Sequence, residues 1–394
     1  MRQSDVNVGI LATVDASVGG GYQYLITLMN SLKSVDAAGY QFFVFHTDPD
    51  FPSGEYEGGN WRCIRISGEK PPADILRKAV KLLFPGYRPV YFEKKYELMR
   101  TFKIDLLVDA TTCLVGYYSE IPYIFTVHDL MHKYYKEFPE VTFLDRVLRD
   151  IIYSRVATRA RRVLVDSQRG KEDVMKFYGV PPERVSIFST APSKVFFDAW
   201  DDTTVNRILD KFNLPEEYVY YPAQFWHHKN HTALLEAIKA LQAKYKYDMS
   251  AVFTGSDKGS LGAVLKKAEV LGLGGKVRYL GYVSEEEKMA LYRKASALVM
   301  PTFFGPANIP VWEAFASGCP VLTSNVHGIA DQVGDAGLLF DPTDPADIAE
   351  KMHLLFIDGQ LRGTVVRKGA EKVKGLTPER HGRLILDIIN QAVA

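Results

Sequence analysis

Short apolar runs recur along the chain, and each is followed by a polar or glycine-containing turn and then by a helical pattern. The runs are rich in Val, Ile, Leu, Phe and Tyr, a composition that suits strands buried on both faces of a parallel sheet. They lie at residues 8–15, 42–46, 105–110, 123–129, 162–167, 218–223, 250–255, 277–281, 297–300, 320–324 and 337–342. Strands that alternate with helices in this way predict an α/β protein with doubly wound, Rossmann-like parallel sheets.

The length of 394 residues exceeds what one hydrophobic core usually supports, so we expect two domains. The alternation pauses after Pro192, where residues 193–217 are polar and charged, and it resumes at Tyr218. We therefore expect a first domain of residues 1–196 and a second of residues 197–377.

Composition indicates a globular protein and argues against several function classes. Apolar residues make up 47% of the chain and charged residues 24%, as in soluble domains. The net charge of +1 argues against binding nucleic acid, which needs a strongly basic surface. The three cysteines form neither a disulfide framework nor a metal-ligand spacing, so a cytoplasmic location is expected. The N-terminal sequence lacks the apolar length of a signal peptide, and no apolar run approaches the ~20 residues that span a bilayer.

Two basic segments are candidates for contact with an anionic surface. Residues 71–103 carry eight Lys or Arg against three Asp or Glu, interleaved with aromatic and apolar residues. Residues 145–162 carry six Arg against two Asp on a predicted amphipathic helix. Such segments favour peripheral membrane contact or an acidic acceptor, and the alternative is a solvated charged face.

Polar residues follow the predicted strands at their carboxyl ends, the edge at which open parallel sheets bind ligands. Gly19, Gly20 and Gly21 form a triple glycine between a strand and a helix, which lets the backbone approach a pyrophosphate. The alternative is a tight turn, because the GxGxxG fingerprint is absent. His128 ends a buried strand, and it is a candidate contact for a sugar hydroxyl or, alternatively, a histidine bonded to nearby backbone. We expect Asp129 to order the following loop or to cap the next helix.

Lys229 lies in the sequence PAQFWHHKNH, just before a predicted helix that Asn230 is expected to cap. A positive charge is unfavourable at a helix N-terminus, and a bound phosphate would offset that cost. The position therefore favours neutralisation of a diphosphate by Lys229. The adjacent His227 and His228 lack the acidic neighbours of a metal site, and no pair of carboxylates follows a strand, so we expect no metal.

The segment Ala297–Gly328 combines a short strand, a loop rich in Pro and Gly, a helix start and a second strand. Its helix carries one acid, Glu313, in apolar surroundings. Such a loop offers backbone N–H groups to a phosphate or a sugar, and the carboxylate suits the vicinal hydroxyls of a ribose. The alternative is a βαβ crossover in which Glu313 complements the helix dipole.

The sequence PTFFGPANIPVWEAFASGCPV within this segment resembles the nucleotide-sugar-binding signature of the retaining glycosyltransferases with the GT-B fold (family 4, glycosyl transferases group 1). In that family two glutamates separated by seven residues flank a glycine-rich loop, and they contact the transferred sugar and the ribose, respectively. Glu313 matches the second glutamate, whereas the first falls on Gly305. A subset of the family uses GP-x-N-x-P here, which implies that Asn308 and its neighbours hold the sugar. These neighbours are Gly305, Pro306, Ala307 and Ile309.

The resemblance implies roles for residues elsewhere in the chain. The His-Asp pair after a strand is similar to the family's active-site histidine, which implies a catalytic role for His128. Lys229 matches a family lysine, whereas Gln224 stands where an arginine is usual. Tyr282 and Val283 match the turn that meets the nucleobase.

Other implications concern the fold. The glycine loop at residues 19–21 is expected to close over the donor phosphates. Two Rossmann-like domains are expected to face each other across a cleft, the first binding the acceptor and the second the donor. The C-terminal helix, residues 378–394, is expected to cross back and complete the first domain.

These implications predict retaining, metal-independent transfer of a hexose from a UDP- or GDP-sugar, with no further cofactor, and Lys229 and Asn308 acting with His128. The expected acceptor is a hydroxyl of a glycan or lipid-linked sugar in polysaccharide biosynthesis. One alternative is another GT-B enzyme, such as a nucleotide-sugar epimerase or a phosphorylase. The other is a non-catalytic nucleotide-sugar-binding protein, suggested by the departures at Gly305 and Gln224.

Overall fold

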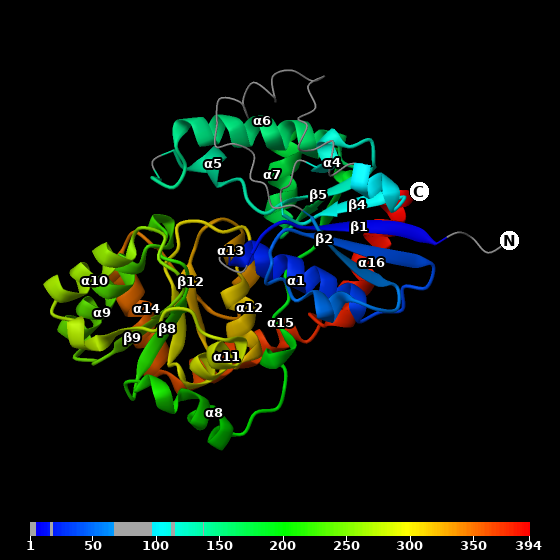
Figure 1. Cartoon of the computed structure of the whole chain (residues 1–394). Helices are drawn as coiled ribbons and strands as arrows, with labels where there is room; N and C mark the ends of the chain where they lie inside the picture. Colours follow the sequence, from blue (N-terminus) through cyan, green and yellow to red (C-terminus); the bar gives the residue numbers. More distant parts are fainter. Residues whose placement is uncertain (1–4, 16–18, 67–96, 112–114, 137) are drawn as a thin grey trace. The chain divides into compact units, whose positions relative to one another are not determined.

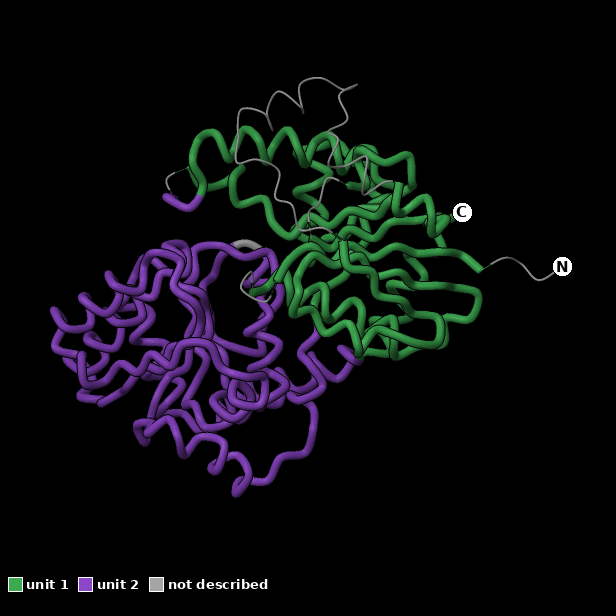
Figure 2. The backbone as a smooth tube through the Cα atoms, in the orientation of Figure 1, with its two compact units in different colours: residues 1–136, 141–190, 378–394 green, residues 137–140, 191–377 purple. Residues whose placement is uncertain are grey.

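The computed structural model describes residues 5–15, 19–66, 97–111, 115–136 and 138–394 (Figure 1). The chain divides into two compact units, coloured separately in Figure 2. Unit 1 comprises residues 1–136, 141–190 and 378–394, and unit 2 comprises residues 137–140 and 191–377. The division after residue 190 lies shortly before the position predicted from the sequence. Residues 137–140 belong to unit 2 although the chain on both sides of them belongs to unit 1, and no sequence pattern predicted this short excursion.

Unit 1 is built on a parallel sheet whose described strands have the order β3-β2-β1-β4-β5-β6-β7. These strands are β1 (Val6–Ala12), β2 (Tyr40–His46), β3 (Trp61–Arg65), β4 (Leu106–Asp109), β5 (Tyr123–Val127), β6 (Arg162–Val165) and β7 (Val185–Ile187). The sheet confirms the predicted doubly wound architecture.

Alternate residues of these strands bury the two faces of the sheet in two separate cores. Val8 and Ile10 of β1 join the core that contains side chains of α1 and α16, whereas Leu11 joins the core formed with α6 and α7. The described helices are α1 (Gly20–Lys33), α4 (Val115–Tyr118), α5 (Met131–Tyr134), α6 (Phe143–Arg159), α7 (Gln168–Tyr178) and α16 (Pro378–Val393). None of the helices described in the chain is both long and apolar enough to cross a membrane.

The C-terminal helix α16 packs against α1 (Figure 1). Gly382 permits a close approach, because a Cβ atom there would lie 2.1 Å from the carbonyl oxygen of Ser31 in α1. Ile385 and Ile389 are fully buried in the same core. This packing confirms that the last helix returns to the first domain.

Unit 2 repeats the architecture with the strand order β10-β9-β8-β11-β12-β13. Its described strands are β8 (Tyr218–Pro222), β9 (Ser250–Thr254), β10 (Val277–Tyr279), β11 (Ala297–Met300), β12 (Val321–Ser324) and β13 (Leu338–Phe340). Its α-helices are α8 (Asp202–Leu209), α9 (His231–Tyr245), α10 (Leu261–Val270), α11 (Glu285–Lys294), α12 (Ile309–Ala316), α13 (His327–Val333), α14 (Pro345–Ile357) and α15 (Gly359–Val373). Ser284 and Glu287 form a capping box at the start of α11, and Asp344 caps α14.

Candidate functional site

The loop between β11 and α12 lies at the carboxyl edge of the unit 2 sheet. It brings Gly305 directly against Asn308: a Cβ atom on Gly305 would lie 2.5 Å from Nδ2 and 2.8 Å from Oδ1 of the asparagine. Asn308 is only 6% exposed, and its Nδ2 atom is buried with no hydrogen-bond partner within the described part of the chain. A buried N–H donor without a partner costs stability, so this loop presents an unused donor.

Glu313, in the second turn of α12, is buried and bonded at both oxygens. Oε1 accepts from Lys288 Nζ at 2.7 Å, and Oε2 accepts from the Tyr292 hydroxyl at 3.0 Å. Lys288 also pairs with Glu285 at 2.7 Å. A carboxylate accepts about four hydrogen bonds, so two acceptor positions remain on Glu313.

Burial acts on the two charges of this pair in opposite ways. Burial alone would lower the pKa of Lys288, but the attraction of Glu313 and Glu285 outweighs it and raises that pKa well above its ordinary value. Burial raises the pKa of Glu313, and the Lys288 ammonium offsets part of that rise. The arrangement holds an ammonium ion between two carboxylates beside the loop.

The segment after β8 holds the other predicted donor residues of unit 2. Gln224 Nε2 donates to Ser256 Oγ at 3.1 Å, and its Oε1 accepts from Trp226 Nε1 at 3.0 Å. Lys229 ends a short 3-10 helix, and its carbonyl accepts from the Tyr221 hydroxyl at 3.0 Å. The structure thus places Gln224 in a bonded turn at the carboxyl edge.

The prediction that the side chain of Asn230 caps α9 is wrong. Asn230 precedes the helix, but its backbone is left-handed, with φ of 55°, and its side chain accepts no bond from the helix. Its Nδ2 atom instead donates to the carbonyl of Pro342 at 2.8 Å. A side chain cannot reach N2 or N3 from a left-handed Ncap as it does from the usual extended one.

His228 is bonded to the 137–140 excursion rather than free at the surface. Glu140 Oε1 accepts from the backbone N of His228 at 2.8 Å and lies 3.2 Å from its Nδ1. Burial would raise the pKa of Glu140, but these bonds with His228 hold it at about 2. Phe138 stacks on Phe303, the residue two before Gly305, so the excursion covers one side of the loop.

The turn that is predicted to meet the nucleobase follows β10. Tyr282 is 79% exposed, whereas Val283 is buried. Gly255, at the end of β9, donates its N–H to the carbonyl of Gly281 and has φ of 126°. A Cβ on Gly255 would lie 2.5 Å from the carbonyl of Ala223, so these three strand ends converge closely.

In unit 1, His128 follows β5 and its ring nitrogens face two acceptors. Nε2 is 3.0 Å from the carbonyl of Ala110, and Nδ1 is 3.8 Å from Asp166 Oδ2. Tyr24 of α1 packs edge-on against the ring, with centroids 4.7 Å apart. Burial would lower the pKa of His128, but Asp166, followed by the Ala110 carbonyl and Asp129, raises it above its ordinary value.

The other predicted unit 1 residues also follow strands, at the same carboxyl edge of the sheet. Gly19 precedes α1 with φ of 74°, and Gly20 and Gly21 begin the helix. Asp129 orders the loop, as expected, by accepting from the N–H of Met131 and pairing with Arg149 at 2.9 Å in each case.

Asp166, Lys288 and Gln332 are polar residues of these two edges that the sequence patterns did not single out. Each is identified as part of a site by its contact with a predicted residue: Asp166 lies beside His128, Lys288 pairs with Glu313, and Gln332 bonds to Asn308. Asp166 directly follows β6, so the strand-end pattern that marked the other candidates applied to it as well, whereas Lys288 and Gln332 lie within helices where no local signal marks them.

Two further features bear on the predicted partners. Within the described residues no group of three or more His, Cys, Asp or Glu is placed to hold a metal ion. Much of the basic segment 71–103 lies outside the described residues. On α6, Arg149 is paired with Asp129, while Phe143 and Leu144 are exposed by 73% and 44%.

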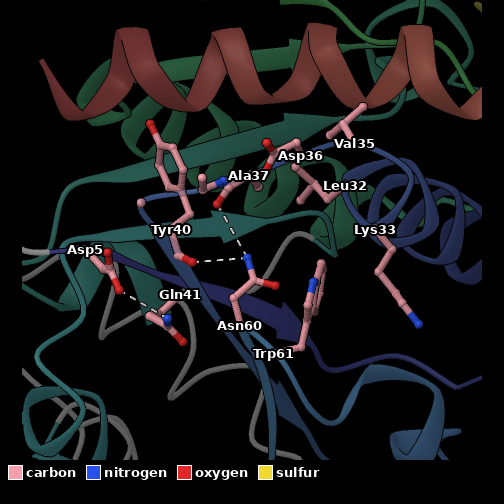
Figure 3. A pocket seen from close by; sticks show the side chains of 12 residues that line it. Asp5, Leu32, Lys33, Val35, Asp36, Ala37, Tyr40, Gln41, Asn60 and Trp61 are labelled. Atoms are coloured by element: carbon pink, nitrogen blue, oxygen red, sulfur yellow. Dashed lines mark hydrogen bonds between the residues drawn. The ribbon is translucent and has the colours of Figure 1, made fainter.

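A cavity of about 320 Å³ opens at the opposite, amino-terminal edge of the unit 1 sheet (Figure 3). It lies where α1 ends and β2 begins, and its polar groups bond to one another. Asn60 Nδ2 donates to the Tyr40 carbonyl at 3.1 Å, and Gln41 Nε2 donates to Asp5 Oδ2 at 3.2 Å (Figure 3). None of the predicted site residues lines it, so the carboxyl edges remain the candidate sites.

Two family models match the chain. Residues 18–191 match the model described as Glycosyltransferase Family 4, and residues 205–372 match the model described as Glycosyl transferases group 1. The chain is 24% identical over 297 residues to O-antigen chain mannosyltransferase B of Escherichia coli, covering 74% of this chain and 76% of that protein. It is 26% identical over 204 residues to the serotype-specific mannosyltransferase WbdA of the same species, covering 51% of this chain but only 25% of that longer protein.

A solved structure shares the fold over nearly the whole chain. Anabaena Alr3699/HepE, determined in complex with UDP-glucose, superposes with a TM-score of 0.73 at 15% identity, covering 97% of this chain and 99% of that chain. At this identity the likeness establishes the architecture and leaves the ligand to be argued from the site.

Proposed function

Because the chain belongs to the family 4 glycosyl transferases (group 1) and has their GT-B fold, we propose that it transfers a hexose from a nucleotide diphosphate sugar to a hydroxyl acceptor. We assign donor binding to unit 2 and acceptor binding to unit 1. The acceptor class that we propose is a glycan or lipid-linked sugar of polysaccharide biosynthesis, as the name of the O-antigen relative suggests.

The observation that carries the proposal is the polar content of the β11–α12 loop and helix. Each oxygen of the buried Glu313 carboxylate accepts one hydrogen bond and can accept a second, which we assign to the two hydroxyls of a ribose, and the buried Asn308 N–H donor is assigned to the sugar. Both groups lie after the carboxyl end of a parallel strand, where such sheets bind nucleotides. A crossover helix with a purely structural role does not need a buried donor without a partner.

The proposed reaction retains the anomeric configuration. The bond between the anomeric carbon and the diphosphate oxygen breaks, and the acceptor oxygen bonds to the carbon on the same face. The acceptor's proton passes to the departing phosphate oxygen. The protein's task is to stabilise the negative charge of the diphosphate and the positive charge of the sugar; Lys229 is assigned to the first and the loop at Asn308 to the second. No metal ion is included in this scheme.

The first experiment measures binding and turnover of UDP-glucose and GDP-mannose by the purified chain. A true donor at 100 times its dissociation constant stabilises the fold by about 2.7 kcal/mol, which raises the melting temperature measurably. Slow release of the nucleoside diphosphate, accelerated by acceptor sugars, is the expected result. Binding without release under any acceptor would indicate a non-catalytic nucleotide-sugar-binding protein, and no binding at all would refute the proposal.

The ribose assignment is tested from the ligand side, so that folding defects cannot confuse the result. We expect the wild-type chain to bind UDP or GDP about 10- to 100-fold more tightly than the 2′,3′-dideoxy analogue, because a hydrogen bond to a charged group is worth about 1.5–3 kcal/mol. Glu313→Gln should reduce this discrimination. Equal affinity of the wild type for both ligands would show that Glu313 does not bind the ribose.

We also propose that the protein works in the cytoplasm and contacts anionic lipid at the inner face of the membrane through the start of α6. The exposed Phe143 and Leu144 and the excess of Arg over Asp in residues 145–162 support this contact. Vesicles with phosphatidylglycerol should sediment the wild-type chain but not Phe143→Ser/Leu144→Ser. Equal sedimentation of both proteins, or none with anionic vesicles, would contradict it.

A further inference from the structure

The backbone of Asn308 is held on both sides by one side chain. Gln332 Oε1 accepts from the Asn308 N–H at 2.9 Å, and Gln332 Nε2 donates to the Asn308 carbonyl at 2.8 Å. Gln332 lies on α13 and is 8% exposed, so both bonds are shielded from water. A side-chain amide that pairs with both the N–H and the carbonyl of one residue fixes the backbone of that residue.

The same helix presses on the loop at a second point. A Cβ atom on Gly328 of α13 would lie 2.2 Å from the carbonyl oxygen of Pro306. The loop is therefore confined between Gly328 and Gln332 on one side and its own Gly305 on the other. With its backbone fixed, Asn308 keeps its side chain against Gly305, and the Nδ2 atom stays without a partner in the described residues.

We infer that Gln332 is a positioning residue for the donor sugar: it fixes the Asn308 backbone so that the Asn308 Nδ2–H group donates to an oxygen of the transferred sugar. This inference rests on the proposed function and adds the residue that orients the site and the chemistry of the contact. A carboxylate at this loop only accepts hydrogen bonds, whereas the amide of Asn308 donates as well. The sugar oxygen that faces Nδ2 is therefore recognised as an acceptor.

The test distinguishes effects on sugar transfer from effects on nucleotide binding. Gln332→Leu should lower kcat/KM for the nucleotide sugar about tenfold, because one lost orienting pair costs about 1–1.5 kcal/mol, while the affinity for UDP or GDP stays within twofold of wild type. Asn308→Ala should produce the same split, and Asn308→Asp should not restore activity, because aspartate accepts but does not donate. The double variant Asn308→Ala/Gln332→Leu should be no worse than Asn308→Ala, because Gln332 acts through the Asn308 side chain.

Gln332→Glu supplies a second readout, the pH dependence of kcat/KM for the nucleotide sugar, which a residue with a purely structural role would not change. A protonated carboxyl both donates and accepts like the amide, but a carboxylate cannot donate to the Asn308 carbonyl. Burial against that carbonyl raises the pKa of the introduced acid, so kcat/KM relative to wild type should recover as the pH falls. Gln360→Leu, an exposed position on α15, serves as the matched control and should behave as wild type.

The possible failures are distinguishable. If the wild-type chain binds no nucleoside diphosphate and turns over no nucleotide sugar, the proposed function is wrong. If the wild type is active and Gln332→Leu is as active, the function stands and the inference about Gln332 is wrong. If Gln332→Leu loses nucleoside diphosphate affinity as much as sugar turnover, the loop binds the diphosphate, and the assignment of Nδ2 to the sugar is overturned.

Discussion

Replacing Lys288 with methionine should destabilise unit 2 strongly, because it leaves Glu313 as a buried charge with only the Tyr292 hydroxyl as a donor. The Lys288 and Glu313 side chains are 13% and 3% exposed, and Nζ lies 2.7 Å from Oε1. At that distance and an effective dielectric constant of about 20, the gross attraction is about 6 kcal/mol. Desolvation offsets much of this in the intact pair, but removal of one partner of a buried pair costs about 3–5 kcal/mol. For a unit of this size that loss lowers the melting temperature by about 6–15 °C.

A double-mutant cycle isolates the cause. Glu313→Gln removes the negative charge and keeps an acceptor for Tyr292, so Lys288→Met/Glu313→Gln should recover about 2 kcal/mol relative to Lys288→Met alone. Lys294→Met is the matched control on the same helix, because Lys294 pairs with Asp202 at 3.0 Å in an exposed position where such a pair is worth less than about 1 kcal/mol. Denaturant unfolding of the four variants measures each free energy.

The pH dependence gives an independent check with a definite sign. Burial raises the pKa of Glu313 in the folded state, and without Lys288 the hydrogen bond from Tyr292 is left as the smaller opposing effect. The folded variant then binds a proton more readily than the unfolded chain, so its stability increases as the pH falls. The deficit of Lys288→Met relative to wild type should be smaller near about pH 5 than near about pH 8. A deficit equal at both pH values, or one no larger than that of Lys294→Met, would refute the charge argument.

Two further predictions concern the loop and the histidine. Gly305→Ala should destabilise the fold by about 1–3 kcal/mol in a denaturant unfolding assay, because its Cβ would displace the Asn308 amide. The double variant Gly305→Ala/Asn308→Gly should relieve this strain. Gly363→Ala, in open space on α15, is the control and should be neutral or stabilising by up to about 1 kcal/mol in the same assay. Asp166→Asn should lower the pKa of His128, because the carboxylate that favours the imidazolium is removed and burial then dominates; NMR titration of the ring measures it, and an unchanged pKa would contradict the pairing. A histidine whose pKa is raised by folding stabilises the fold at pH values below its unfolded pKa, and this stability is lost as the pH rises through its folded pKa. Asp166→Asn should therefore weaken the fall in stability across that pH window. Asp36→Asn, at an exposed position, is the control.

The sequence was sufficient for the architecture because parallel strands buried on both faces are continuous apolar runs with helices between them. It located the carboxyl-edge residues for the same reason: they follow those runs directly. The caps of α11 and α14 were predictable because a capping residue and its partner lie within one turn of sequence. The cap expected from Asn230 is absent because its backbone is left-handed and its side chain bonds instead to the carbonyl of Pro342, 112 residues away.

The partners of the site residues were not predictable because they are set by tertiary packing. Lys288 and Glu313 are 25 residues apart, and Asn308 and Gln332 are 24 apart, each pair joining different helices or loops. A lysine in a helix otherwise rich in charge, or a glutamine in a short helix, is usually a solvated residue. The 137–140 excursion was hidden for the same reason, since Glu140 is recognised only through His228.

The glycine at position 305 is explained by its neighbours as part of a rebuilt loop rather than as the loss of a glutamate. Asn308 occupies the space that any side chain at 305 would need, and Gln332 bonds to both backbone groups of Asn308. A chain that had merely lost a sugar-binding carboxylate would have no reason to bury an amide there and to hold it with a second buried amide, because each buried polar group costs stability unless it is bonded. Three residues thus depend on one another, and the Asn308 Nδ2 group has no hydrogen-bond partner among the described residues. This interdependence supports the proposed donor site over the alternative of a non-catalytic remnant, and it means that exchange of Gly305 alone for glutamate should not restore the family's usual arrangement.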